Sequence, residues 1–243
     1  MGMKQFLMDI RLNIIFICKW IGLSIILGGI CGVVGALFHL SIDYVTEMRL
    51  LHSWIVYLLP LGGVLIVFLY HSFKLDYEPG TNTIIQSVRQ QDHVPLFLAP
   101  SIFLATVITH FVGGSSGREG AALQIGGSIA TGIGKLFHFD KKEMSMLIMC
   151  GMSAVFSALF GTPITATLFS MEVVSVGIFY YASFVPCLCS SLVAMQIAQI
   201  FGCQPEVYQI VGVFDISFLS VLKLVGFSIV IAFFSIIFIL MMH

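Results

Sequence analysis

The sequence predicts an all-α membrane protein, a polytopic helix bundle in which some helices are broken or re-entrant. Hydrophobic residues make up 58% of the 243 residues and charged residues only 9%, against roughly 25% charged residues in a soluble domain. Seven stretches hold no Asp, Glu, Lys or Arg, and most of them reach the about 20 apolar residues that a membrane-spanning helix needs. These stretches are residues 20–42, 50–73, 93–117, 120–134, 144–171, 173–205 and 224–243.

The composition also argues against several classes of function. The formal net charge is −1, so no bulk basic field would attract nucleic acid. The cysteines are scattered through apolar sequence without metal-ligand spacing, so we expect them to pack, with no disulfide, metal or cofactor site. We expect no enzyme activity. The cysteines are Cys18, Cys31, Cys150, Cys187, Cys189 and Cys203.

Apolar stretches bounded by charges, glycine or proline predict nine helices. Two of them, 82–90 and 163–176, are too short to cross a bilayer at about 1.5 Å per residue. We therefore expect re-entrant helices, whose ends are sheltered by other protein or by a water-filled cavity. The predicted helices are 14–46, 54–73, 82–90, 95–112, 118–136, 141–159, 163–176, 179–201 and 217–242.

The first helix carries small residues at a spacing of four, at Ser24, Gly28 and Gly32. This spacing predicts a face for close packing against another helix. Basic residues precede the helix, and basic residues are enriched on the cytoplasmic side of membrane proteins, so we expect a cytoplasmic N-terminus. These basic residues are Lys4, Arg11 and Lys19.

Residues 113–134 contain eight glycines, and Gly117-Arg118-Glu119-Gly120 opens a new helix there. A helix that starts inside a membrane presents unpaired N–H groups and a positive dipole end, which can bind an anion without a full positive charge. An intramembrane glutamate at this place is a candidate functional residue. The alternative is that Arg118 and Glu119 form a loop pair at the water boundary.

A second break lies within residues 156–172. Gly161, Thr162 and Pro163 end one helix and begin another, and we expect Thr162 as the N-cap and Pro163 at the first helical position. The new helix ends near Glu172, which we interpret as a vestibule residue, a partner of a basic residue, or an interfacial carboxylate. A third break, Glu78-Pro79-Gly80-Thr81-Asn82, precedes the short 82–90 helix.

Together these segments resemble the CLC family of chloride channels and transporters. Gly117–Ala121 resembles the family's GREGP motif, and Phe160–Glu172 resembles its FNAPLAG-LF-xx-E motif. Pro79–Thr83 matches the family's GSGIP motif only loosely. The resemblance covers roughly residues 18–203, which correspond to the first of the family's two inverted repeats.

The resemblance implies a homodimer in the lipid bilayer with one pathway per subunit for a halide, chloride or fluoride, and with coupled protons. Glu119 resembles the gating glutamate, whose ionised carboxylate occupies the anion path. We expect an integral, multi-pass protein of a bacterial inner membrane, because the loops are short and cytosolic domains are absent. The implied anion-binding residues are Pro79, Gly80, Thr81, Asn82, Gly117, Arg118, Gly120, Ala121, Phe160, Gly161, Thr162 and Pro163.

The sequence also departs from the family pattern. Pro79 or Gly80 falls where many members have a serine, and Ala121 replaces the proline after GREG. Glu172 matches the first of two adjacent glutamates, but Val173 replaces the second. These departures are similar to the fluoride-exporting branch, and the choices between chloride and fluoride and between channel and exchanger stay open.

A weak internal repeat relates the two ends of the chain at an offset of 204 residues, because Lys19, Gly22, Ser24 and Ile25 recur as Lys223, Gly226, Ser228 and Ile229. We interpret residues 1–243 as one membrane domain, 18–203 as the first repeat, and 217–243 as the opening helix of a truncated second repeat. On this interpretation the chain alone carries no anions. It would then be half of a split transporter or a nonfunctional fragment.

A further alternative is a rhomboid-like intramembrane serine protease. Gly114-Ser115-Ser116-Gly117 fits a GxSG motif, and His110 lies on the preceding helix. A nucleophilic serine needs a base within hydrogen-bond reach. This alternative leaves the following GREG unexplained.

Overall fold

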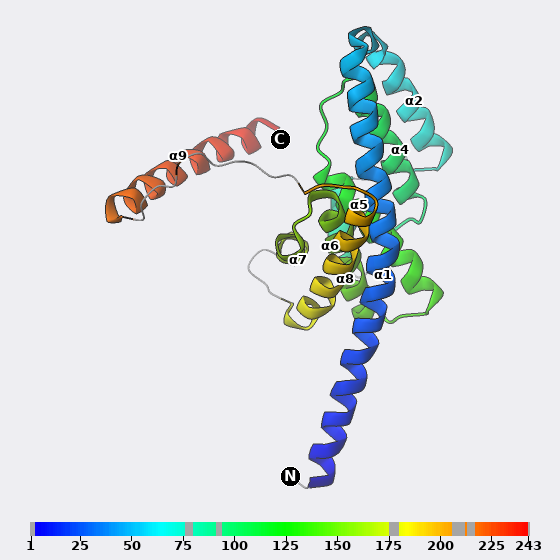
Figure 1. Cartoon of the computed structure of the whole chain (residues 1–243), viewed down its shortest axis with the longest axis vertical. Coiled ribbons are helices and arrows are strands. Elements are labelled where there is room, and N and C mark those ends of the chain that lie inside the picture. Colours follow the sequence, from blue (N-terminus) through cyan, green and yellow to red (C-terminus); the bar gives the residue numbers. More distant parts are fainter. Residues whose placement is uncertain are drawn as a thin grey trace. The chain divides into compact units, whose positions relative to one another are not determined.

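The computed structural model describes residues 3–75, 80–90, 94–174, 180–205, 212 and 217–242, with side chains except at 3–13, 90 and 242. The described chain is helical, as predicted, and contains no strand (Figure 1). Its elements are α1 (Met3–Leu51), the 3-10 helix η1 (Ser53–Leu58), α2 (Leu59–Ser72), α3 (Thr81–Gln90), α4 (Leu98–Phe111), α5 (Glu119–Leu136), α6 (Lys141–Phe160), α7 (Pro163–Glu172), α8 (Tyr181–Ile200) and α9 (Phe218–Met242).

Three predicted helices differ from the sequence expectation, and one of them, predicted at 163–176, ends at Glu172. The helix predicted at 14–46 runs from Met3 to Leu51, because no proline interrupts it and the flanking charged residues are good helix formers. The single helix predicted at 54–73 is divided into η1 and α2. Pro60 lies in the first turn of α2, and it has no N–H with which to continue the hydrogen bonds of η1.

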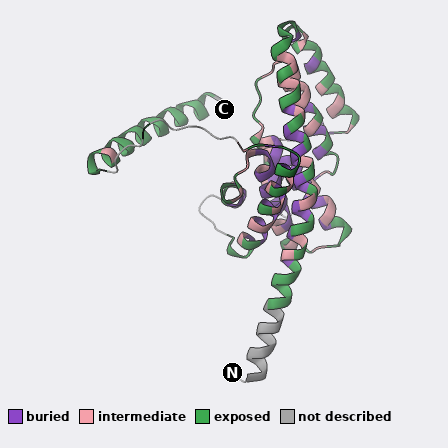
Figure 2. Ribbon diagram, viewed as in Figure 1, coloured by how far each residue is buried: buried purple, intermediate pink, exposed green. Residues whose placement is uncertain are grey.

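The chain forms two compact units, Met1–Glu206 and Val207–His243. In the first unit α6 is the central helix and packs against α1, α5, α7 and α8. Buried residues gather where these helices meet (Figure 2). In the second unit α9 is exposed along almost its entire described length. The division of the chain into one full repeat and the start of another stays a prediction.

Glycines allow the close helix packing that the sequence predicts. A Cβ at Gly28 would lie 2.6 Å from the carbonyl oxygen of Ser190, and one at Gly32 would lie 2.9 Å from the Cα of Ala194. The predicted small-residue face of α1 therefore packs directly on the backbone of α8. Gly126 of α5 and Gly151 of α6 approach each other in the same manner.

Five helical segments of the described chain are long and apolar enough to cross a membrane: Ile14–Leu51, Ser53–Ser72, Lys141–Phe160, Tyr181–Ile200 and Phe218–Met241. By contrast, α3 and α7 have only 10 residues each, or about 15 Å of helix. They cannot span a bilayer of about 30 Å, and their predicted re-entrant placement stays a prediction.

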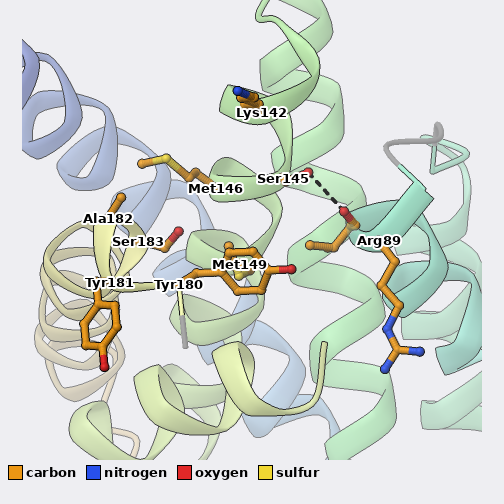
Figure 3. Close-up of a pocket in the computed structure, with 10 residues that line it drawn as sticks. Arg89, Lys142, Ser145, Met146, Met149, Tyr180, Tyr181, Ala182 and Ser183 are labelled. Atoms are coloured by element: carbon orange, nitrogen blue, oxygen red, sulfur yellow. Dashed lines mark hydrogen bonds between the residues drawn. The ribbon is translucent and has the colours of Figure 1, made fainter. Parts of the chain in front are cut away.

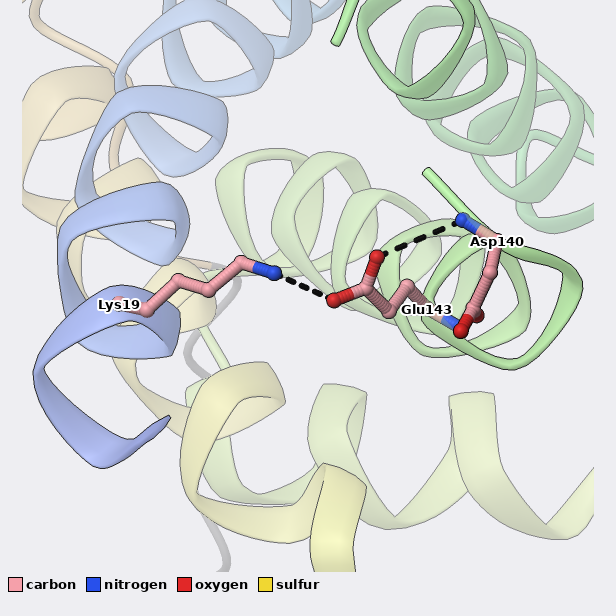
Figure 4. Close-up of polar contacts among 3 residues, drawn as sticks. All are labelled: Lys19, Asp140 and Glu143. Atoms are coloured by element: carbon pink, nitrogen blue, oxygen red, sulfur yellow. Dashed lines mark hydrogen bonds and ion pairs between the residues drawn. The ribbon is translucent and has the colours of Figure 1, made fainter. Parts of the chain in front are cut away.

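An ion pair joins α1 to the capped start of α6 (Figure 4). Lys19 on α1 pairs with Glu143 on α6. Asp140 caps α6 by accepting from the Glu143 N–H at 2.8 Å, and the Glu143 carboxylate reaches back to the Asp140 N–H at 3.4 Å. This capping box satisfies orphan N–H groups at the start of α6, so α6 begins at Lys141.

Candidate functional site

Two of the helix starts that the sequence singled out, those of α3 and α5, lie against each other. A Cβ at Gly120, in the first turn of α5, would lie 2.8 Å from the Oγ1 of Thr81, the first residue of α3. Glycine at position 120 leaves space for this hydroxyl. The loosely matched 79–83 segment and the GREG segment, far apart in sequence, are therefore in contact.

The turn before α7 is joined to the start of α5 by a cation–aromatic contact. The guanidinium of Arg118, the N-cap of α5, lies 5.9 Å from the ring centroid of Phe160. Phe160 ends α6, and Gly161 follows in the left-handed conformation at φ 68°, which glycine adopts without strain. This contact sets the α5 start beside the turn that leads into α7.

A cavity of about 320 Å³ lies between the α3 and α5 starts and helices α2 and α4. Its polar lining includes Thr81, Ser116 and Gln124, together with backbone at Gly117 and Gly120. No charged side chain of the described chain lines it. An ion in this cavity would meet hydroxyl, amide and backbone groups at the positive end of α5.

The predicted anion-binding residues divide into three groups around this cavity. Thr81, Gly117, Gly120 and Ala121 line it. Pro79 lies outside the described residues. The remaining predicted residues are described but do not line the cavity: Gly80, Asn82, Arg118, Phe160, Gly161, Thr162 and Pro163.

Glu119 is the first residue of α5, and its carboxylate folds back over the preceding turn. A Cβ at Gly117 would lie 2.6 Å from Glu119 Oε2, so glycine at 117 leaves room for the carboxylate. The sequence predicts a buried helix start, but Glu119 is exposed in this chain. That expectation is wrong for the described chain, because none of its elements covers this side of α5.

The start of α7 differs in one respect from the predicted N-cap. Thr162 is the N-cap residue and Pro163 occupies the first turn, as expected, but the Thr162 side chain makes no capping hydrogen bond. The turn is determined by Gly161 and Pro163. At the other end of α7, Glu172 is exposed and Val173 packs against the core.

Sequence reasoning missed Gln124, which organises the cavity. Its Nε2 donates to the carbonyl oxygen of Gly120 at 3.2 Å and to Thr81 Oγ1 at 3.3 Å. A carbonyl only accepts hydrogen bonds, so Gly120 determines the orientation of the amide. Thr81 must then accept from Gln124, and its own hydroxyl proton is left to donate elsewhere.

Gln124 is also deeply buried. It is only 6% exposed, and its Oε1 is buried without a hydrogen-bond partner in the described chain. A buried polar group of this kind is uncommon in folded proteins. The sequence does contain a signal: Gln124 is a polar residue four positions after Gly120, on the same face of a helix otherwise lined by small and apolar residues.

The protease alternative finds no support in the geometry. The Nδ1 of His110 lies 2.8 Å from the backbone carbonyl oxygen of Thr106 on its own helix. The ring is thereby held against α4, and no hydrogen bond between His110 and Ser116 occurs among the described residues. Ser116 instead lines the cavity beside Gly117.

Fold and site together define a multi-pass membrane protein in which the short helix α3 and the broken-helix start of α5 meet beside a cavity, an arrangement typical of channels and transporters. Comparison with known protein families identifies the family to which the chain belongs. The family model described as "Voltage gated chloride channel" matches residues 62–243. The chain belongs to this family, the CLC channels and transporters, and the predicted resemblance is confirmed.

Individual relatives agree with this membership. A "Chloride/fluoride channel protein" of Pseudomonas syringae pv. tomato is 34% identical over 216 residues, which cover 88% of this chain and 48% of the relative. The crystal structure of a CLC-type fluoride/proton antiporter is similar with a TM-score of 0.82 and 30% identity, over 88% of this chain and 54% of that chain. The chain thus spans about half the length of these relatives.

A more distant structure shares the fold. A slow cyanobacterial Cl⁻/H⁺ antiporter is similar with a TM-score of 0.59 and 20% identity, over 76% of this chain and 47% of that one. The broken-helix architecture is therefore common to proteins whose sequences have diverged widely.

Proposed function

We propose that this chain forms part of a halide pathway coupled to protons, with Glu119 as its gate. The observation that carries the proposal is the meeting of the α3 and α5 starts at a cavity without charged side chains. Partial charges of helix N–H groups and a hydroxyl bind an anion firmly enough for selection, and loosely enough for release.

In the proposed mechanism Glu119 and the anion compete for the start of α5. An ionised carboxylate at the first helical residue is stabilised by the positive end of the helix. Protonation removes that attraction, so the side chain leaves and an anion takes its place. Proton binding and anion entry are thereby linked at one residue.

For the substrate we infer fluoride, with chloride as the second candidate. The names of two relatives include fluoride, and Pro79 offers neither a hydroxyl nor an N–H. The hydroxyl proton of Thr81, freed by Gln124, is the donor that we propose in place of a serine. Fluoride accepts strong, short hydrogen bonds, so a single oriented hydroxyl suits it.

The same proposal extends to assembly and location. By family membership we infer a homodimer in a bacterial inner membrane with the N-terminus in the cytoplasm. The bundle end that carries Lys19 would then face the cytoplasm, in agreement with the enrichment of basic residues there. The pathway requires further protein around the exposed Glu119, from another chain or another part of this protein.

The test is Glu119→Gln in proteoliposomes of the complete assembly, with halide and proton fluxes recorded together from pH 4.5 to 7.5. Anion flux should continue without pH dependence, and proton coupling should disappear. Glu47→Gln, which removes an exposed carboxylate of α1, is the matched control and should behave as wild type. Unchanged proton-coupled exchange in Glu119→Gln would refute the gate.

A further inference from the structure

The last turn of α1 carries an arginine, Arg49, whose charge is not neutralised by the described chain. Its Nε is buried and has no hydrogen-bond partner among the described residues. The ion pairs Lys19–Glu143 and His39–Asp43 do not involve it, and no described carboxylate pairs with it. An unpaired N–H on a charged, partly buried group costs more than a neutral one. Arg49 is therefore placed to bind an acceptor from outside the chain.

Arg49 lies against the turn that connects α4 to the GREG segment. A Cβ at Gly113 would lie 3.4 Å from Arg49 Cδ and 3.7 Å from its Nη1. Gly113 has a φ of 86°, a conformation that favours glycine. A Cβ at the next residue, Gly114, would lie 2.6 Å from Thr109 Cγ2, and Thr109 lines the cavity at the α5 start. A turn of two glycines therefore joins Arg49 to that cavity.

The chain that follows this turn offers further donors. The N–H groups of the two glycines donate to carbonyl oxygens of α4, at 3.2 and 2.8 Å. By contrast, the N–H groups of Ser115, Ser116 and Gly117 donate to no backbone carbonyl of the described residues. Ser116 and Gly117 line the cavity. Successive backbone N–H groups of this kind favour anions, so donors continue from Arg49 toward the start of α5.

The position of Arg49 also separates it from an ordinary lipid contact. The helix between Lys19 and Arg49 is about 45 Å long at about 1.5 Å per residue, which matches a bilayer with its headgroups. With the N-terminus in the cytoplasm, as inferred above, Arg49 faces the outside. An arginine at this level usually extends toward headgroups. The buried Nε and the contact with Gly113 instead hold Arg49 against the protein.

We propose that Arg49 is an anion-capture site, which holds a halide at the outer mouth of the pathway before the ion moves into the cavity at the α5 start. This inference deepens the proposed function, and its transport consequence rests on that function. The positive charge raises the local anion concentration. The cavity itself has no charged side chain among its described lining residues, so it can stay a weak site that releases the ion.

The first test labels the detergent-solubilised chain with phenylglyoxal, which modifies guanidinium groups, and measures each arginine by peptide mass spectrometry. Fluoride or chloride should slow the labelling of Arg49 about threefold relative to gluconate at the same ionic strength, and phosphatidylglycerol is added in a separate arm. Arg89 is the control. Its Nε donates to the Val174 carbonyl, and it lines a separate cavity (Figure 3), so halide should not change its labelling.

Protection of Arg49 but not of Arg89 by either halide supports the site. Protection by phosphatidylglycerol alone would make Arg49 a headgroup contact, and equal protection of Arg89 would indicate a general effect of salt. Either result, or no protection by any anion, would overturn the proposal. This readout involves no transport, so it succeeds or fails separately from the halide pathway.

The second test measures halide flux of the complete assembly in proteoliposomes while the halide concentration varies on the outer side. Arg49→Gln should raise the half-saturating concentration about fivefold at low ionic strength, with the maximal flux unchanged. The difference should disappear in about 1 M of an impermeant salt, where charges are screened within about 3 Å. Arg49→Lys keeps the charge and should stay close to wild type.

Lys74→Gln is the matched control, because it removes one positive charge from an exposed residue after α2. Its half-saturating concentration should equal that of wild type. An equal rise in Lys74→Gln and Arg49→Gln, or no rise in Arg49→Gln, would contradict capture at Arg49. Absence of halide flux in the wild-type assembly would instead refute the proposed pathway and leave the labelling result to decide on the binding site.

Discussion

At the level of single residues, Gln124 determines which hydrogen bonds the Thr81 hydroxyl can make. Because the Gly120 carbonyl determines the orientation of the amide, the Thr81 hydroxyl accepts from Gln124 and keeps its proton for a ligand. A neutral amide thus converts an ordinary threonine into an oriented donor at the start of α3. In our proposal that donor binds the halide.

Thr81→Val and Gln124→Met should each weaken fluoride binding about tenfold, the size expected for one hydrogen bond to a charged ligand. The double variant should bind no more weakly than either single variant, because both remove the same donor. Calorimetric titration of fluoride into the complete assembly measures this. A loss of fluoride affinity in the double variant equal to the product of the two single losses would contradict the proposal that Gln124 orients the Thr81 hydroxyl.

Thr109→Val is the control for this pair. Thr109 also lines the cavity, but its hydroxyl already donates to the Ala105 carbonyl at 2.7 Å. Its removal should leave fluoride affinity unchanged. An equal loss in Thr109→Val would indicate that the polarity of the cavity, and not one hydroxyl, binds the ion.

At the level of secondary-structure elements, helix contacts through glycine hold the first unit together. α1 lies on α8 through Gly28 and Gly32, and α5 lies on α6 through Gly126 and Gly151. In a membrane, helices gain little from burying apolar side chains, so close backbone approach and dispersion stabilise the contact. These contacts hold α5, and with it Glu119, at a definite position beside α6.

Gly28→Ala should destabilise the first unit by about 1–3 kcal/mol, because the added methyl would meet the Ser190 carbonyl and force the helices apart. Gly22→Ala is the matched control on the same helix, since nothing lies within 4 Å of its added Cβ. It should be neutral or slightly stabilising. Thermal unfolding in detergent compares the two, and equal midpoints would argue against the contact.

At the level of the whole molecule, the two units differ in how they bury apolar surface. The first unit has a continuous core that includes Trp20, Phe38 and Ile125. The described residues of α9 include no buried side chain. The second unit therefore depends on lipid or on other protein for its environment.

Removing residues 207–243 should leave the unfolding midpoint of the first unit within about one degree, because none of its core residues belongs to α9. Fluorescence of the buried Trp20 reports the transition. A truncation that also removes α8 should abolish it, since α8 packs on α1 and α6. A large drop on removing 207–243 alone would show that α9 supports the core.

The sequence predicted most of the fold and part of the site. Helix positions, the short α3 and α7, and the packing face at Gly28 follow from local properties: apolar length, glycine spacing and proline position. The extent of α1, the break at Pro60 and the missing Thr162 cap bond did not. Each of these depends on which of several possible backbone conformations or hydrogen bonds is the most stable, and the pattern of residue types alone does not show this.

What the sequence by itself determined is the family, the all-helical fold and the helix starts at Gly117 and Gly161, because each is encoded in consecutive residues. Only the tertiary structure decided which of these starts meet. Thr81 and Gln124 are separated by 43 residues, and their hydrogen bond exists because glycine at 120 lets α3 approach α5. The exposure of Glu119 was likewise a tertiary outcome, since burial depends on which other elements cover a residue.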